Sequence, residues 1–195
     1  MKAFLKCTLA FGLLTVPQIV CANPTLIGTA TLTGDQEVPP EVTTATGSIS
    51  VYLDGDNWEV SLNFTDLIGG PAIAARIQCC APAGTNAIVA LPFPSFPTTT
   101  AGTYTNTFDL TSSSVYAPSF LTASGGSASG AEATLLAGIE GGQAYVNLSD
   151  TLFPGGEIRG DIAAPSVPEP SGLGITALLL SGLLCALAAR RPLRS

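Results

Sequence analysis

The residues best suited to chemistry in this 195-residue sequence are two adjacent cysteines, Cys79 and Cys80. Neighbouring thiols can form a disulfide, act as a redox switch or bind a soft metal ion. Adjacent side chains of a regular strand point to opposite faces, so a bond between them requires a distorted local turn. In an oxidising compartment such thiols are hard to keep reduced. We therefore predict a structural role, leave a disulfide between them open, and disfavour a redox function.

Two pairs of carboxylates could bind calcium or perform the acid–base work of a glycosidase: Asp35 with Glu37, and Asp54 with Asp56. The second pair favours a turn instead, because the segment lacks the remaining ligand spacing of a calcium loop. A glycosidase also needs aromatic platforms, and one Trp and four Tyr offer few. Combinations of nucleophile and base are missing as well. The sequence predicts no catalytic residue, no metal site and no cofactor.

The middle of the chain is strongly acidic. Residues 23–165 contain thirteen Asp and Glu but only two cationic side chains, Arg76 and Arg159. Such a surface repels phosphate backbones, so nucleic acid is excluded as a partner. We expect both arginines on outer strand faces, in salt bridges with neighbours such as Glu157 or Asp161. An anion site would require the two guanidinium groups to converge.

Alternation of apolar and polar residues predicts strands throughout this region. The clearest signal is a β-hairpin that joins strands 49–53 and 58–64 through an Asp-Gly-Asp-Asn turn. Further strands are expected at 26–32, 73–79, 87–91, 103–110, 144–148 and about 157–162. About eight short strands predict an all-β fold, a Greek-key-like antiparallel sandwich or barrel.

Some side-chain directions and two short helices also follow from the pattern. In the strand 73–79 we expect these residues to face inward: Ile73, Ala75, Ile77 and Cys79. In the last strand Ile158 and Ile162 should face inward, and these should face outward: Glu157, Arg159 and Asp161. Residues 114–121 and 131–139 are the helical candidates, and Ser129 precedes the second.

Both ends of the chain predict export. Residues 1–22 have a basic start, an apolar run and a small-residue cleavage site, as a signal peptide does. Residues 172–189 contain no charge, and as a helix they would span about 27 Å, close to a bilayer core. The arginines that follow predict a cytoplasmic C-terminus. The expected segments are a signal peptide (1–22), a β domain (23–163), a Pro-rich linker (164–171), a transmembrane helix (172–189) and a basic tail (190–195).

Several segments of the β domain together resemble the CHRD domain, the module first named from chordin. These segments are 32–40 (LTGDQEVPP), 76–80 (RIQCC), 142–148 (GQAYVNL) and 153–160 (FPGGEIRG), and the resemblance extends from about residue 26 to 162. Members usually carry a His-Ile-His strand and a third histidine, which looks like a metal site on one sheet face. Here those positions are Arg76, Gln78 and Ser149, and the chain has no histidine. Zinc and copper would therefore lack imidazole ligands.

The C-terminus resembles a PEP-CTERM sorting signal, in which a Pro-Glu-Pro motif precedes an apolar helix and an arginine cluster. The matching residues are Pro168, Glu169 and Pro170. The resemblance implies recognition by an exosortase-type processing enzyme in the inner membrane, followed by transfer to the cell surface or extracellular matrix. The expected partners are that enzyme, the inner membrane, and extracellular polysaccharide or other matrix proteins.

Three functions are compatible with these observations. The first is a non-enzymatic cell-surface or matrix protein whose β domain has a structural or interaction role. The second is a binding module for a polysaccharide or a metal ion such as calcium, which would use the loop 92–103. The third is a metalloenzyme of the superoxide dismutase type, suggested only by resemblance and disfavoured by the absence of histidine.

Overall fold

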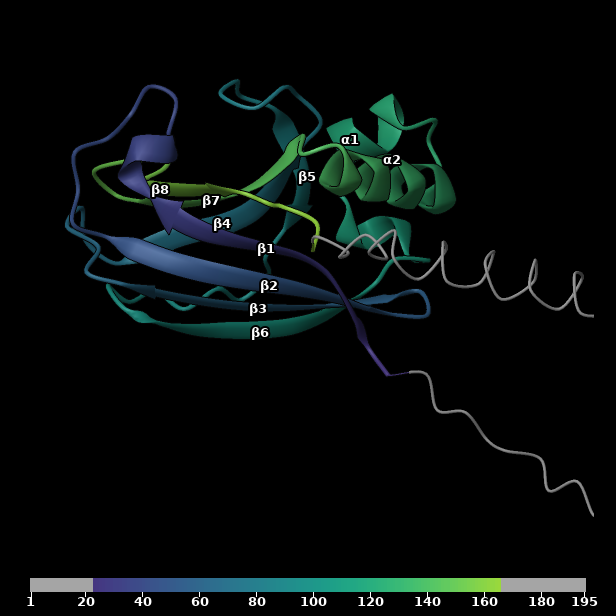
Figure 1. Cartoon of the computed structure of the whole chain (residues 1–195), viewed down its shortest axis with the longest axis horizontal. Coiled ribbons are helices and arrows are strands. Elements are labelled where there is room, and N and C mark those ends of the chain that lie inside the picture. Colours follow the sequence, from purple (N-terminus) through teal and green to yellow (C-terminus); the bar gives the residue numbers. More distant parts are fainter. Residues whose placement is uncertain (1–22, 166–195) are drawn as a thin grey trace, which may run out of the picture.

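The computed structural model describes residues 23–165, which form one antiparallel sheet of eight strands in the order β5-β4-β7-β8-β1-β2-β3-β6. Figure 1 shows how the sheet curls: β1, β2, β3 and β6 lie along one side, and β4, β7 and β8 curl over them. The strands are β1 (Thr25–Thr33), β2 (Thr46–Asp54), β3 (Asn57–Thr65), β4 (Ala72–Cys79), β5 (Ile88–Pro92), β6 (Gly102–Asp109), β7 (Ala144–Asp150) and β8 (Ile158–Asp161). The predicted all-β class and number of strands are confirmed, in the form of a half-barrel.

The predicted hairpin forms as the sequence indicated. Strands β2 and β3 pair without interruption from Thr46 opposite Thr65 to Asp54 opposite Asn57. Between them Gly55 has a φ of 60°, which a residue without a Cβ adopts at little cost. The β2–β3 hairpin pairs along its length with β1 on one side and with β6 on the other. The pairing of β1 with β8, by contrast, consists of one register pair.

The concave side of the curled sheet encloses the hydrophobic core. Alternate residues of β3, from Trp58 to Phe64, are buried, as period-2 alternation requires. They face the apolar residues of the other half of the sheet, among them Ile77, Val146 and Ile158. Trp58, Ile77 and Val146 are all 0% exposed, so both halves contribute to one continuous core.

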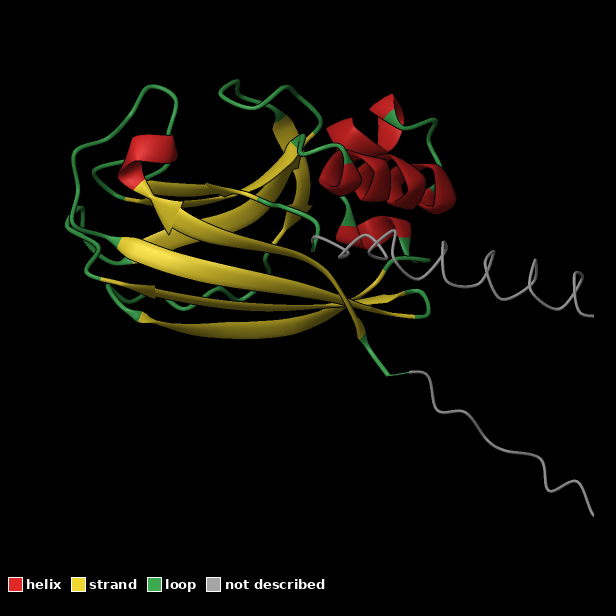
Figure 2. Cartoon of the chain, in the orientation of Figure 1, coloured by secondary structure: helices red, strands yellow, loops and turns green. Residues whose placement is uncertain are grey.

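Two helices lie together at one end of the sheet (Figure 2): α1 (Pro118–Ala123) and α2 (Ala128–Glu140). Helix α2 begins after Ser127, whose side chain accepts a hydrogen bond from the Gly130 backbone N–H at 3.1 Å. The predicted start at residue 131 was therefore three residues late, because Ser127 satisfies a free N–H of the first turn. Two short 3₁₀ turns, η1 (Gly34–Gln36) and η2 (Ser113–Val115), complete the elements.

Strand β4 departs from the predicted direction of one side chain. Ala75, Ile77 and Cys79 are buried as expected, but Ile73 is 55% exposed. The register of β4 against β7 shifts between Ala72 and Ala74. Ile73 is therefore the extra, unpaired residue of a bulge, which interrupts the alternation of the strand.

Several predictions fall outside the described residues. They are the signal peptide 1–22, the Pro-Glu-Pro motif at 168–170, the membrane helix 172–189 and the basic tail 190–195. Within residues 23–165, neither α1 nor α2 has the length and apolar character needed to cross a membrane.

Candidate functional site

The outer side of β4, β7 and β8 carries a layer of polar side chains, which we call the polar layer. Register pairing aligns these residues in rows across the three strands: Arg76, Asn147 and Arg159 in one row, and Gln78, Tyr145 and Asp161 in the next. Directly paired residues point to the same face of a sheet, so each row presents its side chains together. All seven residues of β7 are buried, because its outer face is covered as well as its inner face.

The covering segments come from three loops. The segment after β1 places Glu37 over Asn147. The β4–β5 loop brings Asn86 to this segment, where the Asn86 side-chain amide donates a hydrogen bond to the backbone carbonyl of Val38 at 2.9 Å. The β7–β8 loop, residues 151–157, closes the remaining side. The polar layer is therefore an interior environment, in which each polar group needs a partner.

Arg159 is buried in this layer instead of lying on the surface, where the sequence placed it. Its side chain is 1% exposed, and its guanidinium carbon lies 3.4 Å from the centre of the Tyr145 ring. Its Nη2 forms a salt bridge of 3.0 Å with Asp161, one of the two predicted partners, and Nη1 donates to the Thr85 carbonyl at 3.2 Å. Strand alternation predicted the face correctly, but it could not reveal that loops cover that face.

The three positions at which the family resemblance implies histidines are close together but differently engaged. Arg76 donates through Nη2 to the Ser149 hydroxyl at 2.7 Å, and Ser149 donates to the Ala74 carbonyl at 3.3 Å. Gln78 donates to the Ala87 carbonyl at 2.7 Å. A guanidinium group has no lone pair for a metal ion, and its positive charge repels one. These residues do not fit a zinc or copper ion, and within residues 23–165 there is no other group of three or more metal-binding side chains.

Glu37 and Asn147 form the central pair of the polar layer. The Asn147 amide nitrogen donates to both Glu37 carboxylate oxygens, at 3.0 and 3.1 Å. Burial raises the pKa of Glu37 to about 7, although the nearby positive charge of Arg159 acts in the opposite direction. Near neutral pH this carboxyl group therefore exchanges between its protonated and ionised forms. The side-chain oxygen of Asn147, Oδ1, is buried and has no hydrogen-bond partner.

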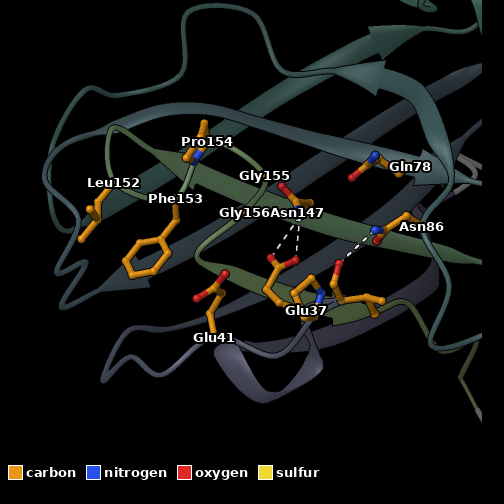
Figure 3. A pocket seen from close by; sticks show the side chains of 12 residues that line it. Glu37, Glu41, Gln78, Asn86, Asn147, Leu152, Phe153, Pro154, Gly155 and Gly156 are labelled. Carbon is orange, nitrogen blue, oxygen red and sulfur yellow. Dashed lines mark hydrogen bonds between the residues drawn. The ribbon is translucent and has the colours of Figure 1, made fainter.

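A cavity of about 310 Å³ opens beside this pair (Figure 3). Its polar wall consists of two carboxylates and three carboxamides, and its apolar wall comes from the segments 38–39 and 152–154. The residues that line it are Glu37, Val38, Pro39, Glu41, Gln78, Asn86, Asn147, Leu152, Phe153, Pro154, Gly155 and Gly156. Neither Arg76 nor Arg159 lines it, so the cavity presents carboxylates and amides but no cation.

A second buried acidic pair, Asp150 and Glu157, holds the β7–β8 loop against neighbouring segments. Both side chains are 0% exposed, so Glu157, which strand alternation placed on the outer face, is covered there instead of being exposed. Glu157 accepts hydrogen bonds from the Thr43 hydroxyl and from the backbone N–H of Ile68 and Gly69. Burial and the adjacent Asp150 carboxyl raise the pKa of Glu157, which favours the protonated form of Glu157.

Cys79 and Cys80 are joined by a disulfide in the structure. Cys79 is buried at the end of β4, and Cys80 is exposed. Helix α2 packs directly on the two sulfurs at Gly138, where a Cβ would overlap both of them. The bond thus lies between the sheet and α2, which fits the structural role predicted for this pair.

The other candidates from the sequence do not form a site. Asp35 is exposed whereas Glu37 is buried, and Asp54 and Asp56 are exposed at the hairpin turn. The loop 92–103, proposed as a ligand-binding segment, directs its aromatic rings inward: Phe93 stacks on Tyr104 at 5.1 Å, and Phe96 stacks on Phe64 at 5.3 Å. Its aromatic residues are part of the core and its surroundings, so they offer no exposed platform.

Sequence reasoning missed the roles of Asn147, Asp150 and Tyr145. They belong to β7, whose sequence is that of an ordinary half-exposed strand. Its polar side chains are interior only because loops cover them. The one available signal was the Pro-Gly-Gly turn at 154–156, since paired glycines often mark a close approach of the backbone. A Cβ at Gly156 would in fact overlap both Asn147 and Glu37.

The fold and site define a small all-β domain in which loops enclose a polar layer on one face of a curled sheet. The sequence model of the CHRD domain matches residues 28–162, which extend from within β1 to just beyond β8. The chain therefore belongs to the CHRD domain family. No curated protein and no solved structure matches the chain.

Proposed function

We propose that this chain is an exported, non-enzymatic protein of the cell surface or extracellular matrix, and that its CHRD domain serves as an interaction module. The observation that carries the proposal is the cavity whose polar wall holds only carboxylates and carboxamides. Such groups can orient and bind a partner by hydrogen bonds. They offer no activated hydroxyl, thiol or amine for covalent catalysis.

Export and sorting are supported by the sequence outside the described residues. A segment with signal-peptide character begins the chain, and the segment 168–194 combines the Pro-Glu-Pro motif, an apolar stretch and arginines in the order of a PEP-CTERM signal. In this proposal an exosortase-type enzyme of the inner membrane processes the chain and passes it to the surface or matrix.

Of the two other functions, ligand binding is favoured by one observation and the metalloenzyme by none. The cavity beside Glu37 and Asn147 gives an interaction module a defined place to bind a partner. A superoxide dismutase-like reaction needs a redox metal, and the Arg76 guanidinium next to Ser149 is unsuited to hold one.

Substituting alanine for all three residues of the sorting motif, Pro168, Glu169 and Pro170, should block processing. We expect the variant to stay in the inner-membrane fraction at its unprocessed mass, with at least about a tenfold loss of protein from the surface and matrix fractions. Cell fractionation followed by intact-mass measurement checks this in a host that carries an exosortase-type enzyme.

The matched control is Ser166→Ala, two residues before the motif, which should sort as the wild type does. Equal surface delivery of the triple variant and the control would contradict sorting through this motif. A wild-type chain that remains in the inner membrane would contradict the surface location itself.

A further inference from the structure

The Asn147 side chain leaves one buried acceptor of the polar layer without a hydrogen-bond partner. Its Nδ2 donates to Glu37, but its Oδ1 is buried without a partner, in a side chain that is 3% exposed. Buried acceptors nearly always receive a hydrogen bond from protein, water or ligand. Asn147 lines the cavity, so an occupant of that space is one source of the missing donor. The Nε of Arg76, the residue paired with Asn147 across β4 and β7, is a second buried group without a partner.

The charges around the cavity exclude several classes of occupant. The lining contains two acidic side chains, Glu37 and Glu41, and no cation, so nothing there would compensate the charge of a phosphate, sulfate or uronate group. Burial disfavours the ionised form of Glu37 that a metal ion or an amine would require.

The polar side chains fit hydroxyl groups well. Gln78, Asn86 and Asn147 present planar carboxamides, each with donors and an acceptor, and a hydroxyl group likewise donates and accepts. Several carboxamides at one wall can therefore satisfy several hydroxyl groups of one molecule. Sugars carry such hydroxyl groups on successive ring carbons.

The apolar wall suits the other side of a sugar ring. Phe153 is half-buried and lines the cavity next to Pro154 (Figure 3). An aromatic face and a proline ring provide a rigid apolar surface against which the C–H groups of a pyranose can pack. A volume of about 310 Å³ is at the lower end of the range for small-ligand sites, which suits one monosaccharide unit.

We infer that the cavity beside Glu37 and Asn147 binds a neutral monosaccharide unit of a polysaccharide. Asn147 Oδ1 accepts from one hydroxyl group, Gln78 and Asn86 bind others, and Phe153 packs against the ring. This inference rests on the proposed role as a surface interaction module, and it gives that module a ligand class.

The test is an equilibrium titration of the full-length chain, held in a detergent without a sugar headgroup and followed by ligand-observed NMR. The probes are neutral gluco-, galacto- and manno-oligosaccharides, with a uronate oligosaccharide, spermidine and calcium chloride as the competing classes. We expect saturable binding of at least one neutral oligosaccharide. If none of them binds, or only the uronate, the amine or calcium does, the inference is wrong.

Two variants locate the binding site. Gln78→Ala and Phe153→Ala should each weaken the affinity for that oligosaccharide at least about tenfold, while Ile73→Ala, exposed on β4 and not part of the cavity lining, should not change it. Fluorescence of buried Trp58 verifies that each variant is folded. Unchanged affinity in both folded variants would overturn the assignment to this cavity.

Surface sorting without sugar binding would overturn only this inference, whereas sugar binding by a chain that is not sorted would overturn only the proposed location.

Discussion

Replacing Gly156 by alanine is expected to destabilise the domain by about 3 kcal/mol. Gly156 has a φ of 144°, which side chains rarely adopt, and a Cβ there would overlap the Asn147 amide nitrogen and the Glu37 carboxylate. The added methyl group would therefore strain the backbone and separate the central pair of the polar layer. Urea unfolding followed by Trp58 fluorescence measures the change in the free energy of unfolding.

The neighbouring glycine supplies the matched control. Nothing lies within 4 Å of a Cβ built on Gly155, so Gly155→Ala should change the stability by no more than about 0.5 kcal/mol. Equal and small effects at both positions would show that the Glu37–Asn147 pair does not depend on the close approach of this loop. That result would contradict the packing described for the cavity wall.

Stability should fall as the pH rises between about 4.5 and about 7. Burial raises the pKa of Glu37 from 4.5 to about 7, so over this range the folded chain holds a proton that the unfolded chain releases. The stabilisation is complete below the lower value and is lost as the pH passes the upper one. The expected loss from Glu37 is on the order of 2–3 kcal/mol. Urea unfolding at about pH 5 and about pH 8 measures it.

Glu37→Gln isolates this contribution, because glutamine keeps an acceptor for Asn147 but cannot ionise. The variant should lose much less stability than the wild type between the two pH values. Some dependence should remain, since burial also raises the pKa of Glu157 and Glu132. Glu59→Gln, exposed on β3, is the control and should behave as the wild type does. An identical pH dependence in Glu37→Gln and wild type would contradict a buried, partly protonated Glu37.

Local patterns predicted most strands, because a strand's alternation and its turn residues lie within a short stretch of the sequence. The β2–β3 hairpin follows from alternation on both sides of a turn whose residues tolerate positive φ. By contrast, the exposure of Ile73 depends on a bulge between Ala72 and Ala74, which exists only where β4 pairs with β7. Such an irregularity depends on the partner strand, so the sequence of β4 alone does not reveal it.

The candidate site was harder to predict than the fold, because it depends on which loops cover which face. Alternation placed Arg159 and Glu157 opposite the core, where an uncovered strand would expose them. In the structure Arg159 is 1% exposed and Glu157 is 0% exposed, since loops distant in sequence close over them. The Pro92–Thr103 loop was the segment predicted to bind a ligand, but its aromatic rings pack against Phe64 and Tyr104.

The central claim is that this CHRD domain is a non-enzymatic binding module whose polar layer holds no metal. The most direct test is the metal content of the full-length chain, recovered from an oxidising compartment without chelator and measured by plasma mass spectrometry. Because Arg76 bonds to Ser149 where the family resemblance implies imidazole ligands, we predict zinc and copper well below one atom per chain. One tightly held zinc or copper atom per chain would contradict the account and return the metalloenzyme function to consideration.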